Sequence, residues 1–248
     1  DSYFTGVSEG VIGYHRLIKM LTVHEGELVV EEKGIYSIER FLTARRLMYW
    51  QVYLHKTVLA AELMLIQVLE RAKDLIEQGE SLPAPSALCY FLENRDLTSA
   101  DFKNRRDELL EIFARLDDTD IAAAVKEWQR HPDPALSFLA QGLANRRLFR
   151  LEFSYEPFSA AYKEEIKQRI LQNPELPEAG LPYFLIEGKE TNTSYSTSKD
   201  EIRILLKSGK VVPMSQLSDT AIQQRMFTKY YLCYPKSAKP PTEADSQP

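Results

Sequence analysis

The stretch 43–56 concentrates side chains that can bind phosphate and sugar groups: Arg45, Tyr49, Tyr53, His55 and Lys56. An arginine presents a planar fork to phosphate oxygens, and a lysine adds a compact positive charge. A tyrosine stacks on a base or hydrogen-bonds a sugar. A histidine near neutral pH donates to a phosphate or shuttles a proton. These residue types indicate recognition of a phosphorylated, sugar-bearing ligand.

The spacing of these residues places most of them on one side of a helix. At about 100° per residue, Arg45, Tyr49, Val52 and Lys56 fall on one stripe, with Tyr53 on one flank and His55 on the other. Spacing alone favours the commoner arrangement, in which the aromatic rings are buried in a core and the cations are solvated. Both interpretations stay open at this point.

A long helical segment must position this stripe. From Ser37, a plausible N-cap, to about Gln78 the chain has no Gly and no Pro, and apolar residues recur at helical spacing. Gly79 and the Pro83/Pro85 pair end it. Roughly forty residues exceed an ordinary globular helix, so we predict a break near His55.

The remaining elements alternate between helices and short strands. We predict a hairpin over 21–30 and four helices at 85–93, from Thr98, at 117–130 and at 133–147. A strand at 150–153, a helix at 158–171, a buried strand at 183–186, a hairpin over 201–212 and a strand at 227–234 follow. This pattern predicts an α+β fold that is predominantly helical, followed by a small antiparallel sheet with flanking helices.

Composition excludes several classes of protein. A net charge of −5 gives no strong signal for nucleic-acid binding or for an anionic membrane surface, and no apolar run approaches the length of a membrane span. Cys89 and Cys233 lie far apart in apolar stretches and indicate free thiols of a reducing compartment, so we expect a cytoplasmic protein.

Segments 36–42 and 53–56, together with Arg45, resemble the region downstream of the metal site in HD-superfamily phosphohydrolases. The similarity is to the deoxynucleoside triphosphate triphosphohydrolase branch and its bacterial cousins. Asp1–Gly6 resembles the segment just after the last metal-ligating aspartate of that family. The resemblance covers most of residues 1–150 and is vaguer beyond.

The resemblance implies roles for individual residues. Arg45 matches the arginine that grips the substrate triphosphate, and Tyr53 matches a tyrosine packed beside the sugar. His55 matches a neighbouring active-site position, and Lys56 follows in the same motif. Asp1 matches an aspartate near the sugar hydroxyl. A nucleotide or other phosphate ester is the implied substrate, and a homo-oligomer is the implied assembly.

The chain departs from the family at the metal. HD proteins hold divalent metals with an H…HD…D pattern, whereas this sequence has no His-Asp dipeptide, and His15, His24, His55 and His131 are isolated. A capping or surface role is the expected one for His131. We therefore expect the metal ligands of a longer parent protein to lie upstream of Asp1, and none in this chain.

The resulting expectation is a chain in three parts: residues 1–150 from an HD-type helical domain, a small α+β module at 151–235, and a disordered tail at 236–248. The main hypothesis is the C-terminal part of a metal-dependent nucleotide phosphohydrolase, inactive as this fragment. One alternative is a non-catalytic nucleotide-binding or oligomerisation module. A plain helical scaffold follows if the stripe is core.

Overall fold

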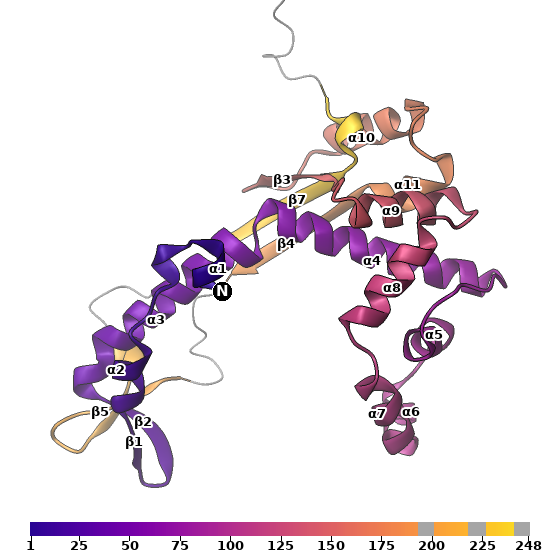
Figure 1. Cartoon of the computed structure of the whole chain (residues 1–248). Helices are drawn as coiled ribbons and strands as arrows, with labels where there is room; N and C mark the ends of the chain where they lie inside the picture. Colours follow the sequence, from indigo (N-terminus) through magenta and orange to yellow (C-terminus); the bar gives the residue numbers. More distant parts are fainter. Residues whose placement is uncertain (193–200, 218–226, 241–248) are drawn as a thin grey trace, which may run out of the picture. The chain divides into compact units, whose positions relative to one another are not determined.

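The computed structural model describes residues 1–192, 201–217 and 227–240 (Figure 1). Over these residues the chain has eleven α-helices and two small sheets, one mixed and one antiparallel. The predicted α+β class is therefore confirmed.

The chain folds as two compact units, each built from two segments of sequence. The first comprises Asp1–His55 and Lys189–Lys229, and the second comprises Lys56–Gly188 and Tyr230–Pro248. The predicted division into domains at 1–150 and 151–235 follows the family resemblance along the sequence, and it stays a prediction.

The first unit contains a four-stranded sheet in the order β1-β2-β5-β6. Both predicted hairpins are confirmed, since β1 pairs antiparallel with β2 and β5 pairs antiparallel with β6. The parallel pairing of β2 with β5, Val30 opposite Ile204, joins the hairpins into one sheet and was not predicted. The elements are α1 (Ser2–Thr5), α2 (Tyr14–Lys19), β1 (Leu21–His24), β2 (Glu27–Glu31), α3 (Ile35–Met48), β5 (Arg203–Leu205) and β6 (Val211–Pro213).

Helix α3 lies against this sheet through a small apolar core. Ile38 and Leu42 from the helix are buried together with Val30, Ile204 and Val212 from the strands. Burial of these side chains fixes the rotation of α3 about its axis, and so decides which of its residues face outward.

The second unit is mainly helical, with one three-stranded sheet in the order β3-β7-β4. Most of its helices match the predicted ones to within a few residues at the ends, but the one helix predicted from Thr98 is interrupted at Arg105 and forms α6 and α7. They are α4 (Lys56–Glu77), α5 (Ser86–Glu93), α6 (Ser99–Asn104), α7 (Arg106–Ala114), α8 (Asp118–Trp128), α9 (Pro134–Ala144), α10 (Ala160–Gln172) and α11 (Leu181–Phe184). The strands are β3 (Arg150–Ser154), β4 (Ile186–Asn192) and β7 (Phe227–Tyr234); β4 continues into the first unit from Lys189, and β7 begins there and enters the second unit at Tyr230.

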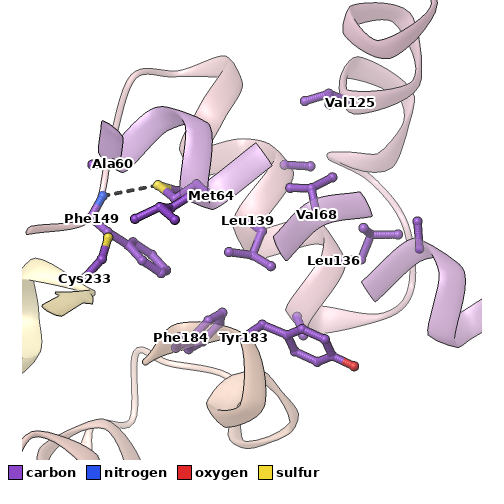
Figure 2. Close-up of a cluster of buried hydrophobic side chains, with 14 of the residues drawn as sticks. Ala60, Met64, Val68, Val125, Leu136, Leu139, Phe149, Tyr183, Phe184 and Cys233 are labelled. Atoms are coloured by element: carbon purple, nitrogen blue, oxygen red, sulfur yellow. Dashed lines mark hydrogen bonds between the residues drawn. The ribbon is translucent and has the colours of Figure 1, made fainter. Parts of the chain in front are cut away.

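Helices α4 and α9 form the centre of the second unit's core. Figure 2 shows Met64 and Val68 of α4 beside Leu136 and Leu139 of α9. The backbone N–H of Phe149 donates to the Met64 sulfur at 3.2 Å (Figure 2), which satisfies a buried amide at the start of β3.

The predicted strand at 183–186 is wrong in its first half. Residues 181–184 form the short helix α11, and β4 begins only at Ile186. Pro182 stands in the first turn of α11, where its fixed φ suits a helix and its missing N–H costs nothing. Phe184 then turns into the core against Phe138 and Phe149, with ring centroids 5.1 and 5.7 Å away. A short apolar run does not distinguish these outcomes by itself.

The C-terminal end is ordered further than the predicted tail allows. Lys236–Ala238 form a 3-10 turn, and Ala238 is fully buried. Residues 241–248 of the predicted tail lie outside the described residues.

Within the described residues, no single helix is both long and apolar enough to cross a bilayer. The consecutive segments Glu32–Tyr53 and Lys56–Glu77 reach that composition only when they are counted together. Helix α4 buries its apolar side in the core of the second unit.

A polar network inside the second unit ties α4 to α9 and α11. Arg71 makes a bidentate contact with Asp133, with Nε–Oδ1 at 3.1 Å and Nη2–Oδ2 at 2.6 Å, and donates to the Tyr183 hydroxyl at 3.3 Å. Asp133 also caps α9 by accepting from the Leu136 amide at 2.7 Å. Burial alone would raise the pKa of Asp133, but Arg71 and Leu136 outweigh it and hold that pKa below its usual value.

Replacing Asp133 by alanine is expected to lower the free energy of unfolding by about 3 kcal/mol, because Arg71 keeps a largely buried charge without its carboxylate partner and α9 loses its cap. Urea denaturation of the whole chain measures this. Glu165→Ala is the matched control, because it breaks the exposed Arg169–Glu165 pair and should cost about 0.5 kcal/mol or less. Equal losses in both variants would contradict the importance of the network.

Candidate functional site

A depression of about 370 Å³ on the first unit gathers several of the predicted site residues. It contains Arg45 and Tyr53 from the predicted stripe region and Asp1 from the start of the chain. Its lining consists of Asp1, Ser2, Gly10, Ile12, Phe41, Ala44, Arg45, Met48, Tyr49 and Tyr53. We call this surface the Arg45 depression.

A π-helical turn over Tyr49–Tyr53 decides which side chains reach the depression. The backbone N–H of Leu54 donates to the Tyr49 carbonyl at 2.7 Å. This carbonyl is five residues earlier in the chain, whereas an α-helical N–H donates to the carbonyl four residues earlier. The extra residue shifts the side chains that follow it, so Tyr53 rather than Val52 joins Arg45 and Tyr49 in the lining of the depression. The predicted stripe of Arg45, Tyr49, Val52 and Lys56 is corrected accordingly, because Val52 and Lys56 are not in the lining.

The lining side chains hold one another through a chain of contacts. The Arg45 guanidinium carbon lies 4.8 Å from the centre of the Tyr49 ring, and its Nη2 is 3.5 Å from the Tyr49 hydroxyl. Tyr49 and Tyr53 meet edge to face at 5.1 Å between centroids. The Tyr53 hydroxyl in turn donates to the Asp1 carboxylate. A cation and a carboxylate thus stand at opposite ends of a tyrosine pair.

These side chains are open to solvent rather than part of the hydrophobic core. Arg45 and Asp1 are exposed, Tyr53 is 38% exposed and Tyr49 is half-buried. The interpretation in which the stripe aromatics are core residues therefore does not describe this surface. An exposed arginine resting on a phenol ring keeps N–H groups that face outward and can donate to an anion.

A second contact supports the π-turn from the strand side of the same unit. The Lys229 ammonium lies 4.1 Å from the centre of the Trp50 ring. Lys229 belongs to β7, so this contact links the turn to a segment far away in sequence. Tertiary contacts of this kind hold a local geometry that an isolated helix would not adopt.

The other two predicted site residues lie beyond the π-turn. His55 is exposed and is not in the lining of the Arg45 depression, although it makes contacts of its own. Lys56 is exposed and begins α4 in the second unit. The structure thus brings Asp1, Arg45 and Tyr53 together within one depression, and neither His55 nor Lys56 contributes to its wall.

The sequence did not single out the wall formed by Gly10 and Ile12. The 3-10 turn Ser8–Gly10 packs on α3, and a Cβ on Gly10 would stand 2.4 Å from the Met48 sulfur and 2.9 Å from Ser2 Cβ. Glycine at this position therefore permits a close approach that shapes the depression. The only sequence signal for this wall was the clustering of Gly6, Gly10 and Gly13, and that clustering predicted a loop.

Comparison with known proteins finds an HD associated region in one part of the chain. Residues 12–85, which include α3, the π-turn and all of α4, match a family model described as an HD associated region. A phosphohydrolase from Bacteroides thetaiotaomicron, known from a crystal structure, is 46% identical, with a TM-score of 0.84 over 94% of this chain and 58% of that one.

Two further relatives extend the comparison. Protein YwfO of Bacillus subtilis, which is described as uncharacterised, is 28% identical over 95% of this chain and 53% of its own length. A hypothetical protein from Aquifex aeolicus shares the fold, with 24% identity and a TM-score of 0.57. The chain spans little more than half the length of YwfO and of the Bacteroides phosphohydrolase.

A relation to HD proteins implies metal use, and the residues of this chain can be tested for it. Over the described ranges, no group of three or more His, Cys, Asp and Glu side chains is placed to hold a metal ion. The Arg45 depression has a single carboxylate, Asp1, which already accepts a hydrogen bond from Tyr53. These residues do not fit a metal site, so no catalytic step is assigned to a metal on them.

Gly10→Ala is expected to lower the free energy of unfolding by about 1–3 kcal/mol, because the added methyl group overlaps Met48 and Ser2. Thermal denaturation of the whole chain checks this. Gly13→Ala is the control, since a Cβ at Gly13 meets nothing within 4 Å. If Gly10→Ala is as stable as the control, the wall of the depression is looser than described.

Proposed function

We propose that this chain forms part of the substrate-binding wall of a longer nucleotide phosphohydrolase of the deoxynucleoside triphosphate triphosphohydrolase type. One observation carries the proposal: Arg45, Tyr49, Tyr53 and Asp1 converge on a single depression. The similarity to the Bacteroides phosphohydrolase and the HD associated region supports the reaction class. The substrate and its deoxy sugar rest on the resemblance of the motif.

Arg45 would bind the phosphate end of the substrate. Its guanidinium is exposed at the depression and rests on the Tyr49 ring, which orients the fork without neutralising its charge. Its outward N–H groups suit two phosphate oxygens at once, and an ordered cation loses less entropy on binding than a free one.

Tyr53 and Asp1 would bind the sugar. The Tyr53 ring offers an apolar surface, and its hydroxyl holds the Asp1 carboxylate in place. That carboxylate has further lone pairs with which it can accept from a sugar hydroxyl. The depression has a cation, Arg45, at one end and an anion, Asp1, at the other. This arrangement matches a ligand with phosphates at one end and a sugar hydroxyl at the other.

The hydrolytic metals would come from another part of the longer protein. A metal bound there would activate water and polarise a phosphate, whereas the residues of this chain would hold and orient the substrate. His55, just beyond the π-turn, is proposed as a further phosphate contact. Lys56 is assigned no geometric role.

A binding or assembly module without turnover is the second candidate. It is favoured by the lack of any grouped metal ligands in the described part of the chain. Both candidates use the Arg45 depression to bind a nucleotide, and they differ in whether the parent protein turns it over.

Arg45→Ala in the longer protein is expected to weaken binding of a deoxynucleoside triphosphate roughly tenfold or more, since a charge-assisted bidentate contact contributes about 1.5–3 kcal/mol. Isothermal titration calorimetry measures the affinity. Arg40→Ala is the matched control, because Arg40 is exposed on the same helix and does not line the depression. Unchanged affinity in Arg45→Ala, with intact circular dichroism, would contradict the assigned role.

The chain by itself is expected to release neither phosphate nor triphosphate from nucleotides when Mg²⁺ or Mn²⁺ is added, because its described residues do not fit a metal site. A phosphate-release assay, together with chromatography for the nucleoside that accompanies triphosphate release, checks this. Metal-dependent turnover that is abolished by a chelator would refute the division of labour proposed above.

A further inference from the structure

Helix α7 carries an apolar groove that is open to solvent. The groove has a volume of about 540 Å³, and its lining consists of Phe102, Lys103, Arg106, Leu109, Leu110 and Phe113. Positions 106, 109, 110 and 113 follow the i, i+3, i+4, i+7 spacing of one helical face. We call this surface the α7 groove. It shares no residue with the Arg45 depression, and it lies outside the residues that match the HD associated region.

The apolar side chains of the α7 groove comprise a buried floor and exposed walls. Leu109 is fully buried and forms the floor. Phe102, Leu110 and Phe113 are 47%, 56% and 60% exposed. The Phe91 ring meets the Phe113 ring edge to face at 6.2 Å between centroids, which holds one wall in place. Single exposed apolar residues are common on protein surfaces, whereas several gathered in one groove mark an interaction site.

The charged side chains of the α7 groove are both cationic. Lys103 and Arg106 are exposed, and neither belongs to an ion pair in the part of the chain that the structure describes. The acids of α7, Asp107, Glu108 and Glu111, are not in the lining. Glu108 and Glu111 each pair with an arginine that is also outside it. The groove is therefore positive in a chain of net charge −5, and this local sign favours an acidic ligand.

The shape of the α7 groove suits a helix better than a small molecule or a membrane. A small-molecule site encloses most of its ligand, whereas the walls of this groove are about half exposed. An amphipathic helix lies in such a groove and buries only its apolar stripe. From Arg106 to Phe113 the face extends about 10 Å at 1.5 Å per residue, which is about two turns of a bound helix. An anionic membrane requires a predominantly basic face, and the three exposed acids of α7 oppose that binding.

We propose that the α7 groove binds an amphipathic helix of a partner protein, and that this helix has acidic residues at one end of its apolar stripe. Arg106 is the first residue of α7 and Lys103 precedes it by three positions, so both cations belong to the same end of the groove. Leu110 and Phe113 line the groove further along α7. The partner's apolar side chains pack on these two residues above Leu109, and its carboxylates pair with the two cations.

Fluorescence anisotropy of two labelled synthetic peptides with the whole chain tests the charge part of the proposal. Both peptides carry leucine at i, i+3, i+4 and i+7 of one helical face. One has glutamates flanking one end of this stripe, and the other has lysines there. The wild type should bind the glutamate peptide roughly tenfold more tightly than the lysine peptide, because two attractions replace two repulsions. The double variant Lys103→Glu, Arg106→Glu should reverse this preference, which a loss of folding would not do.

The apolar part of the proposal is tested with the same glutamate peptide. Leu110→Gln should weaken its binding roughly tenfold, because the change removes an apolar side chain from the groove wall and keeps a good helix former. Leu171→Gln is the matched control, since Leu171 is 43% exposed on α10 and does not line the groove. The charge reversal keeps the test decisive even if Leu110→Gln fails to fold.

Several results would overturn the proposal. One is a wild type that does not bind the glutamate peptide at about 1 mM, or that prefers the lysine peptide. Another is an equal loss of binding in Leu110→Gln and Leu171→Gln. Self-association in sedimentation velocity that Leu110→Gln abolishes, or binding to phosphatidylserine vesicles that it abolishes, would identify a different occupant of the groove.

Discussion

The candidate site depends on the π-turn at Tyr49–Tyr53. An α-helix through these residues would place Val52 on the stripe and Tyr53 on its flank, whereas the wider turn, closed by the bond from Leu54 to the Tyr49 carbonyl, has Tyr53 rather than Val52 in the lining. Such turns are rare, and they are frequently found at functional sites. Burial of Ile38 and Leu42 at one end of α3 and the stacking of Lys229 on Trp50 at the other hold it in place.

The second unit shows a different way of fixing helices. Its core is apolar around α4 and α9, and a charged pair, Arg71 with Asp133, is satisfied by hydrogen bonds at the edge of that core. A buried pair of this kind contributes more to a defined geometry than to net stability, because desolvation offsets much of its attraction. The HD associated region at residues 12–85 covers both α3 and α4, so the match includes Arg45, Tyr49 and Tyr53 of the site, but not Asp1 or Gly10, and the start of this core.

Local pattern was enough to predict most elements and the break near His55. The absence of Gly and Pro from 35 to 78 indicated helix, and its length required an interruption. The sequence did not predict that the interruption is a π-turn, because a contact that stabilises the turn comes from Lys229, far along the chain. The β2–β5 pairing and the wall at Gly10 also join residues distant in sequence. The residue types at Arg45, Tyr53 and Asp1 pointed to the site, but their grouping needed the fold.

The most direct measurement of the central claim is a crystal structure of the chain with a non-hydrolysable deoxynucleoside triphosphate. The account predicts phosphate oxygens within hydrogen-bond distance of the Arg45 guanidinium, and the sugar against Tyr53 with a hydroxyl donating to Asp1. A nucleotide bound elsewhere on the chain, with the Arg45 depression free of it at saturating concentration, would contradict the account.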